Sequence, residues 1–298
     1  MPAVVPVTRA AEAPVTSARR RSAVAYLLML PAMAWLAVFF VIPLVSLFLT
    51  SLQKPIPGKV GKYQPGLEFG NYVNAFVEYW GVFLKSFLYA GIATILALLI
   101  AYPLAYFIAF RAGRWRGFLL VLVVAPFFAS FLLRTYAWKT ILADEGVVTS
   151  TLNSLHLLPD GRILSTGIAV VAGLTYNFLP FMILPLYASL ERIDPKLIEA
   201  SGDLYATAFA GLRKVTFPLS LPGVVAGTLL TFIPAAGDYI NAELLGSPRD
   251  KMIGNAIQTN FIEFRDYPIA SALSFILMAA ILTVVMLYIR RAGTEDLV

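Results

Sequence analysis

Six long apolar stretches, separated by polar connections, constrain this chain more than any other feature of its sequence. An α-helix needs about 20 mostly apolar residues to cross a bilayer core that is about 30 Å thick. The stretches lie near residues 24–50, 82–110, 117–138, 166–190, 221–244 and 269–289. Each is long enough to span, so we predict an all-α membrane protein with six transmembrane helices.

The composition agrees and excludes several classes of protein. The apolar fraction is 59% and the charged fraction only 13%, whereas soluble domains carry about 25% charged residues. With no cysteine and one histidine, His156, disulfides, thiolate sites and histidine-rich metal sites are excluded. The chain also lacks a GxxxxGK[ST] loop, so we expect it to bind no cofactor. If the protein works with ATP, we expect another subunit to bind and hydrolyse it.

The distribution of lysine and arginine predicts the topology. Basic residues favour the cytoplasmic side of a membrane, and this rule explains the net charge of +6 better than a nucleic-acid-binding face does. We expect a cytoplasmic tail at 1–22, a transmembrane domain at 23–291 and a cytoplasmic tail at 292–298. A signal peptide is the alternative for the N-terminus, but the first apolar run is too long and no small-residue cleavage site closes it. The basic residues of the expected cytoplasmic side are Arg9, Arg19, Arg20, Arg21, Arg111, Arg114, Arg116, Arg192, Lys196, Arg213, Lys214, Arg290 and Arg291.

The connection at 191–223 is too polar to span and too patterned for a plain linker. Asp194 followed by Pro195 is typical of a helix start. A second helix is expected from Ala206 to about Val215, ending at Pro218. Its apolar face could enter the groove of a partner protein or lie on lipid headgroups, and these residues alone do not separate the two.

This connection resembles the EAA loop of ABC-importer permeases. Glu199-Ala200-Ser201 takes the place of E-A-A, and Val215-Thr216-Phe217-Pro218 ends the motif in register. The resemblance implies that the loop docks on an ATPase subunit. Tyr205 stands where the family has glycine, and Gly202 is expected to take over the turn, because a tyrosine with positive φ is strained. The implied coupling residues are Glu199, Ala200, Ser201, Gly202, Tyr205, Phe209 and Arg213.

The resemblance extends from about Arg21 to Arg291 and is closest to permeases of the spermidine/putrescine type. The matching stretches read FLLRTYAW from Phe131, YNFLPF from Tyr176, and FIPAAGDY from Phe232. It implies a type I, methionine-importer-like transmembrane domain in a bacterial inner membrane, with both termini cytoplasmic. The implied partners are two ATPase subunits that bind ATP and Mg²⁺, a second permease subunit, an extracytoplasmic substrate-binding protein and membrane lipid, but no nucleic acid.

Two carboxylates lie in or near the fifth apolar stretch, where an ionised group is costly unless it faces a cavity or a partner. Asp238 and Glu243 are therefore candidates for the substrate pathway, and a pair with Arg134 or a neighbouring helix is the structural alternative. Aromatic faces would suit a cationic cargo through cation–π contact, although packing or interfacial anchoring is the favoured role for Trp138 and Tyr176. The candidate pathway residues are Asp238, Glu243, Tyr239, Asn177, Tyr176 and Trp138.

The sequence thus predicts a non-catalytic permease subunit, with a polyamine as cargo and another small solute as the alternative. A stand-alone secondary transporter would need its own coupling-ion site and usually an inverted repeat. No repeat is evident, and the patterned loop would then have no role. A membrane enzyme would need clustered acids, histidines or a nucleophile at one membrane face, and the scattered carboxylates argue against it.

Overall fold

The computed structural model describes residues 28–57, 61–156, 161–203, 205 and 207–292. The predicted N-terminal tail, and the C-terminal tail beyond Ala292, lie outside this range. The chain divides into two compact units, residues 1–50 and 51–298. The described part of the first unit is a single apolar helix that begins at Leu28. It contains a π-helical segment, η1 (Ala37–Val41), followed by α2 (Ile42–Ser51).

In its described ranges the second unit is helical apart from loops and one short antiparallel pair, β1 (Lys54–Pro55) with β2 (Tyr63–Gln64). Its first half contains α3 (Gly70–Phe110), η2 (Gly113–Trp115), α4 (Arg116–Val124), η3 (Ala125–Phe128), α5 (Phe131–Ile141), α6 (Val147–Ser154) and α7 (Gly167–Glu191). Its second half contains α8 (Pro195–Asp203), α9 (Ala208–Gly211), η4 (Leu212–Thr216), α10 (Phe217–Leu219), α11 (Leu221–Ala236), α12 (Ile240–Leu245), η5 (Pro248–Asp250), α13 (Ile253–Ile262) and α14 (Tyr267–Ala292).

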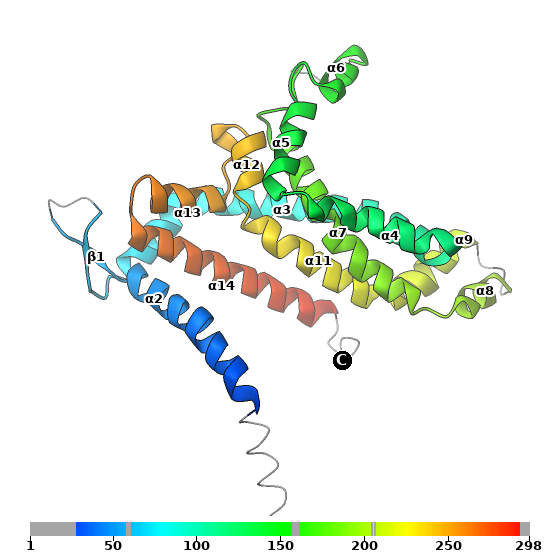
Figure 1. The fold of residues 1–298 in the computed structure, drawn as a ribbon, viewed down its shortest axis with the longest axis horizontal. Coiled ribbons are helices and arrows are strands. Elements are labelled where there is room, and N and C mark those ends of the chain that lie inside the picture. The colour runs from blue at the N-terminus through cyan, green and yellow to red at the C-terminus, as the bar shows by residue number, and fades with distance from the viewer. Residues whose placement is uncertain (1–27, 58–60, 157–160, 204, 206, 293–298) are drawn as a thin grey trace, which may run out of the picture. The chain divides into compact units, whose positions relative to one another are not determined.

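Helices α3, α7 and α11 run side by side and form the core of this unit (Figure 1). Helix α3 contributes a stripe of buried alanines spaced three or four residues apart, which places them on one face. Small side chains let helix backbones approach closely in a membrane, where packing replaces the hydrophobic effect as the force between helices. The stripe consists of Ala90, Ala93, Ala97, Ala101 and Ala105.

Helix α11 meets α7 through a Gly-x-x-x-Gly pattern, Gly223 to Gly227. A Cβ atom at Gly223 would lie 2.5 Å from Cβ of Ser189 and 2.8 Å from the carbonyl oxygen of Pro185. At Gly227 it would lie 2.8 Å from the sulfur of Met182. Only glycine permits this contact, so α7 and α11 are in backbone-to-backbone contact over the first part of α11.

Replacing Gly223 with alanine is expected to lower the thermal stability of the chain. The added methyl would overpack the contact with Pro185 and Ser189 by about 1–3 kcal/mol, which exceeds the gain in helix propensity of about 1 kcal/mol. Gly91 is the matched control, because a Cβ at that position meets nothing within 4 Å. Thermal unfolding in detergent should show a lower Tm for Gly223→Ala and an equal or higher Tm for Gly91→Ala. Equal Tm values for both variants would contradict the close contact.

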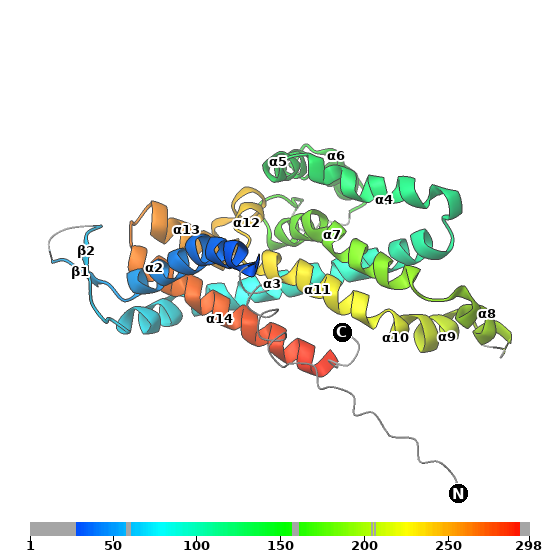
Figure 2. The same cartoon turned by 60° about the horizontal axis from the view of Figure 1, so that its bottom comes forward.

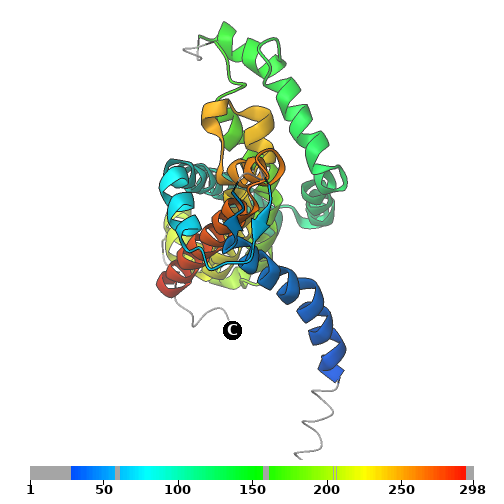
Figure 3. The ribbon, with the colours of Figure 1, turned by 90° about the vertical axis from the view of Figure 1, so that its left-hand side faces the viewer.

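The two ends of the helical core differ in structure. Helices α8, α9 and α10 lie at one end of α7 and α11, whereas the β1–β2 pair and the loop before α14 lie at the opposite end (Figure 2). Helices α5 and α6 extend away from the core (green in Figure 3). The end with α8–α10 carries the resemblance to the EAA loop, and we call it the coupling end; the opposite end is called the outer end.

The prediction of an all-α membrane fold is confirmed, although two of the predicted spans differ in detail. Among the described residues, four helices are long and apolar enough to cross a membrane, and up to six spans result if each of two bent pairs counts as one. The predicted helix at 117–138 is instead bent by 94° between Phe128 and Phe131, because Ala129 and Ser130 are extended. The predicted helix at 221–244 ends at Ala236, and α12 begins only at Ile240.

Candidate functional site

The break between α11 and α12 places a carboxylate inside the helical unit. Pro234 precedes the end of α11, and Gly237 and Asp238 leave the helix. The side-chain oxygen Oδ1 of Asp238 accepts a hydrogen bond from the backbone N–H of Asn241 at 2.8 Å, so it caps the first turn of α12. Asp238 is buried, with 9% of its surface exposed, and no ion pair involves it within the described residues.

Three buried polar side chains from α5, α7 and α12 form a cluster next to this break. The amide nitrogen Nδ2 of Asn177 donates to Oδ1 of Asn241 at 3.0 Å and to Oγ1 of Thr135 at 3.2 Å. Asn177 and Asn241 are almost fully buried. Nevertheless, Oδ1 of Asn177 and Nδ2 of Asn241 have no hydrogen-bond partner in the described part of the chain. Buried polar atoms are usually paired, so this polar cluster has one acceptor and one donor available to a ligand.

Gly173 on α7 makes the cluster possible. A Cβ atom there would lie 2.4 Å from Cδ1 of Leu245 and 2.6 Å from Oδ1 of Asn241. Any larger residue would push α12 away from α7 and separate Asn241 from Asn177.

A second set of contacts joins α12 to α13. Asn255 Nδ2 donates to Oε2 of Glu243 at 3.0 Å and to the backbone oxygen of Tyr239 at 2.9 Å. Glu243 and Tyr239 are themselves exposed. The structure therefore brings Asp238, Tyr239 and Glu243 together on one short segment, and Asn255 on α13 holds that segment in place.

The remaining predicted residues of this region pack on each other. The rings of Trp138 and Tyr176 lie 5.3 Å apart, centroid to centroid, which matches the packing role considered for them. The alternative that Asp238 or Glu243 pairs with Arg134 is wrong for the described residues. The other form of that alternative, a bond to a neighbouring helix, is confirmed for Glu243, which accepts from Asn255 on α13. The Arg134 guanidinium instead lies over the rings of Phe127 and Phe131, 5.0 and 5.5 Å from their centroids.

Three residues of these contacts were missed by sequence reasoning, namely Thr135, Asn241 and Asn255. For Asn241 and Asn255, the signal in the sequence is the asparagine side chain itself, because an amide that interrupts an apolar helix in a membrane needs a partner. Asn241 follows Asp238 by three residues, a spacing that places the two on one side of a helical turn.

The coupling end consists of two short helical segments joined by a turn. The prediction that Asp194 caps the first one is confirmed, because Oδ1 of Asp194 accepts from the backbone N–H of Lys196 at 3.0 Å. Thr207 caps the second segment in the same way through Ala210. The two segments pack closely, since a Cβ at Gly211 would lie 3.0 Å from Oγ of Ser201.

The residues that the EAA resemblance singles out are mostly on the surface. Tyr205 is 97% exposed and Phe209 is 70% exposed. Glu199, Ala200, Gly202 and Arg213 are exposed as well, and the Glu199 carboxylate makes no hydrogen bond or ion pair within the described chain. This surface is available to a partner, and its fold does not depend on the Glu199 carboxylate.

One prediction about the coupling end is wrong. Gly202 does not take over the turn, because it lies inside α8, and Tyr205 itself adopts a φ of 58°, which costs a non-glycine residue roughly 1–3 kcal/mol. The predicted stop at Pro218 agrees with the structure to within one residue, because the second segment runs through the π-helical η4 and ends at Leu219.

Two polar contacts connect the coupling end to the core. The hydroxyl of Tyr102 on α3 lies 2.9 Å from Oγ of Ser220, at the point where the chain bends by 68° between Leu219 and Leu221. Arg116 at the start of α4 forms an ion pair with Glu191 at the end of α7 at 2.7 Å. The coupling end is thus attached to α3, α4, α7 and α11.

Comparison with known proteins is consistent with this arrangement. The spermidine/putrescine transport system permease protein PotB of Haemophilus influenzae is 38% identical over 86% of this chain and 90% of its own length. PotB of Escherichia coli is 37% identical over 71% of this chain and 78% of its own length. The inner membrane ABC transporter permease protein YdcU of Escherichia coli is 34% identical over 73% of each.

The fold also matches a solved structure. A chain of a bacterial ABC transporter involved in the import of alginate superposes with a TM-score of 0.72 at 17% identity, covering 95% of this chain and 99% of that one. The family model for the binding-protein-dependent transport system inner membrane component matches residues 101–292, a range that includes both the coupling end and the polar cluster. This chain belongs to the family of binding-protein-dependent transport system inner membrane components.

Proposed function

We propose that this chain is one transmembrane half of an ATP-driven importer of polyamines such as spermidine and putrescine. The similarity to spermidine/putrescine permeases over 86% of the chain carries the proposal. The site supports it, because carboxylates, an amide and aromatic rings are the groups that a flexible organic cation needs when it leaves water.

The partners follow from the family and from the exposed coupling end. Two ATPase subunits bind ATP and Mg²⁺, a second permease subunit completes the pathway, and an extracytoplasmic binding protein delivers the substrate. This chain itself catalyses no reaction. The excess of lysine and arginine at the coupling end and the termini favours a cytoplasmic position for both, in a bacterial inner membrane.

Coupling would proceed through contacts that lie on the surface and at the bend. An ATPase subunit that closes on ATP displaces α8 and the turn at Tyr205. The displacement reaches α7, which continues into α8, and α11, which follows the bend at Ser220. Because α7 carries Asn177 and α11 leads into Asp238, the displacement opens or closes the polar cluster.

Substrate would pass the break between α11 and α12. Asp238 and Glu243 provide negative charge, and the ring of Tyr239 is exposed beside them. The unpaired Oδ1 of Asn177 can accept a hydrogen bond from an ammonium group of the substrate. Trp138 and Tyr176 support this region by packing on each other.

The test is ATP hydrolysis by the complete complex in lipid, with binding protein loaded in turn with spermidine, putrescine and an unrelated amino acid. A polyamine should stimulate hydrolysis, and Asp238→Asn should reduce the stimulation at least fivefold, because the amide keeps the cap on α12 but removes the charge. Stimulation only by the amino acid would overturn the assignment of a polyamine as cargo, but not the assignment of the chain to an importer. Failure of any ATPase subunit to associate would overturn the importer itself.

A further inference from the structure

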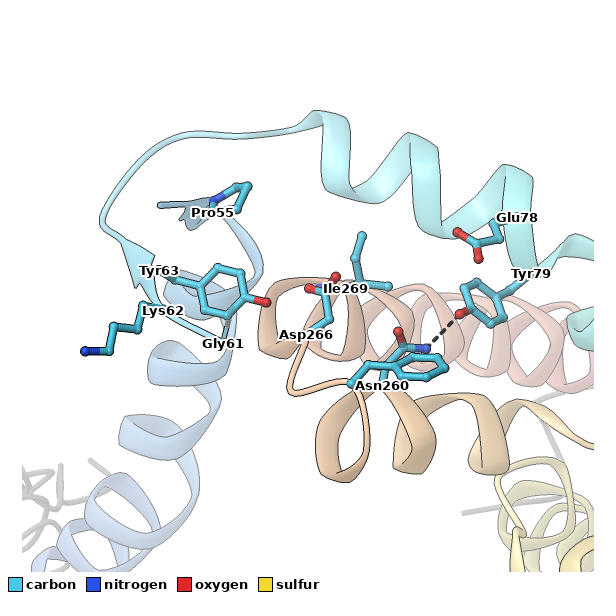
Figure 4. Close-up of a pocket in the computed structure, with 10 residues that line it drawn as sticks. Pro55, Gly61, Lys62, Tyr63, Glu78, Tyr79, Asn260, Asp266 and Ile269 are labelled. Atoms are coloured by element: carbon cyan, nitrogen blue, oxygen red, sulfur yellow. Dashed lines mark hydrogen bonds between the residues drawn. The ribbon is translucent and has the colours of Figure 1, made fainter. Parts of the chain in front are cut away.

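A cavity of about 390 Å³ lies at the outer end of the second unit, far along the helices from the coupling end. The β1–β2 pair, the first turns of α3 and the junction between α13 and α14 enclose it. Figure 4 shows Tyr63, Glu78, Tyr79, Asn260 and Asp266 around this space. Its volume lies in the range of sites for small molecules, and none of these residues belongs to the polar cluster.

Asn260 gives this cavity a preformed polar group. It is 4% exposed, and its Nδ2 donates to the hydroxyl of Tyr79 at 2.8 Å and to the backbone oxygen of Ala256 at 2.9 Å. Both donors are thereby used, whereas its side-chain oxygen accepts no hydrogen bond within the described residues. In Figure 4 that oxygen points away from Tyr79 into the space between the helices. An acceptor oxygen without a donor, on a side chain that is otherwise buried, favours a ligand that brings N–H groups.

The charges around the cavity favour a cation. Glu78 and Asp266 contribute carboxylates. Oδ1 of Asp266 accepts a hydrogen bond from the backbone N–H of Ile269 at 3.3 Å, which fixes the position of this carboxylate. The ammonium group of Lys62 points away from Asp266 (Figure 4). Arg265 contributes its backbone oxygen, which accepts from the Tyr63 hydroxyl at 3.0 Å, and its side chain is not part of the lining.

The two tyrosines add neutral aromatic walls. Burial, together with the neighbouring Asp266 carboxylate, raises the pKa of Tyr63 to about 12, so its hydroxyl remains protonated at physiological pH. Tyrosine rings attract organic ammonium groups through their faces, and paired carboxylates form charge-assisted hydrogen bonds with them. The lining also holds donors, in the Lys62 ammonium and the two tyrosine hydroxyls, but its two carboxylates would repel an anion.

We propose that this outer cavity binds a primary ammonium group of a free linear diamine or polyamine, separately from the polar cluster. Glu78 and Asp266 supply the charge, Asn260 accepts a hydrogen bond, and Tyr63 and Tyr79 form the walls. The choice of ligand rests on the proposed polyamine function. Such a site would concentrate the substrate class at the outer end of the permease.

The experiment measures equilibrium binding of radiolabelled putrescine to the complete complex, without binding protein or ATP, in nanodiscs of phosphatidylcholine and phosphatidylglycerol. The double variant Glu78→Gln, Asp266→Asn should bind putrescine at least fivefold more weakly. Glutamine is tolerated at the exposed Glu78, and asparagine can still cap α14. Glu78→Gln alone should give an intermediate loss, which keeps the test valid if the double variant does not fold.

Glu263→Gln is the matched control, because Glu263 is an exposed carboxylate next to the same loop but outside the cavity lining. It should bind like the unchanged chain. Equal binding by the double variant would overturn the site, as would displacement of putrescine by an equal concentration of Mg²⁺. Loss of putrescine binding when phosphatidylethanolamine is added would assign the cavity to a lipid headgroup. It would overturn the proposal that the ligand is a free diamine or polyamine. Putrescine binding here without polyamine-stimulated hydrolysis would refute the proposed cargo but not the cavity.

Discussion

Replacing Glu199 with lysine is expected to abolish substrate-stimulated ATP hydrolysis and to reduce transport at least tenfold. The Glu199 side chain is exposed and has no partner among the described residues, so the fold of the chain should be unaffected. The loss would arise between subunits, because a lysine would place a charge of the wrong sign where the resemblance implies an ATPase contact. The measurement is hydrolysis by the reconstituted complex with loaded binding protein.

The control for this variant is Glu145→Lys, which reverses the charge of another exposed carboxylate in the loop before α6. It should hydrolyse ATP and transport substrate at the normal rate. Thermal unfolding of the Glu199→Lys chain alone should match that of the unchanged chain. Full coupling in Glu199→Lys would show that α8 does not contact the ATPase through this residue.

Replacing Asn177 with leucine is expected to have the second large effect, because it removes the central donor of the polar cluster. Oδ1 of Asn241 would lose its hydrogen bond from Asn177. Leaving a buried polar group unsatisfied costs about 1–3 kcal/mol, so the Tm should fall. Transport of spermidine by the complete complex should fall at least tenfold, because both the position of α12 and the free Oδ1 acceptor are lost.

Thr175→Val on the same helix is a suitable comparison. Thr175 is also buried, but its hydroxyl donates to backbone oxygens of Val171 and Ala93 that lie outside the polar cluster. The Val171 carbonyl also accepts the helical hydrogen bond from the backbone of residue 175, so valine should leave it satisfied, and transport should remain within about twofold of normal. If Asn177→Leu transported spermidine at the normal rate, the polar cluster would not belong to the substrate pathway.

Much of the fold could be predicted from the sequence, because apolar length and the need to satisfy backbone groups in lipid leave few alternatives to helices. The breaks could not be predicted in the same way. Averaged hydropathy does not register the extended pair Ala129-Ser130 or the helix end before Gly237. The glycines at 223 and 227 are visible in the sequence, but only the tertiary structure shows which helix they contact.

The residues of the candidate site, too, could be predicted from the sequence only in part. Asp238 could be singled out because a carboxylate in an apolar run is costly, and the structure places it at a buried helix break. Asn241 and Thr135 acquire their importance only through contact with Asn177 on another helix. The motif marked the position of the turn, but the expectation that Gly202 would relieve Tyr205 was wrong, because the positive φ lies on the tyrosine itself. The coupling and pathway roles of these residues stay predictions.

The glycine contact between α7 and α11 determines how force can travel through this subunit. Two helices in backbone contact resist sliding or rotation against each other, since close-packed interiors deform little. From Leu221 to Ala236, the 16 residues of α11 extend about 24 Å at 1.5 Å per residue. In the proposed importer the two helices would therefore move together as one rigid body. A displacement applied at the coupling end would reach the break before α12 directly, without a series of side-chain rearrangements along the helices.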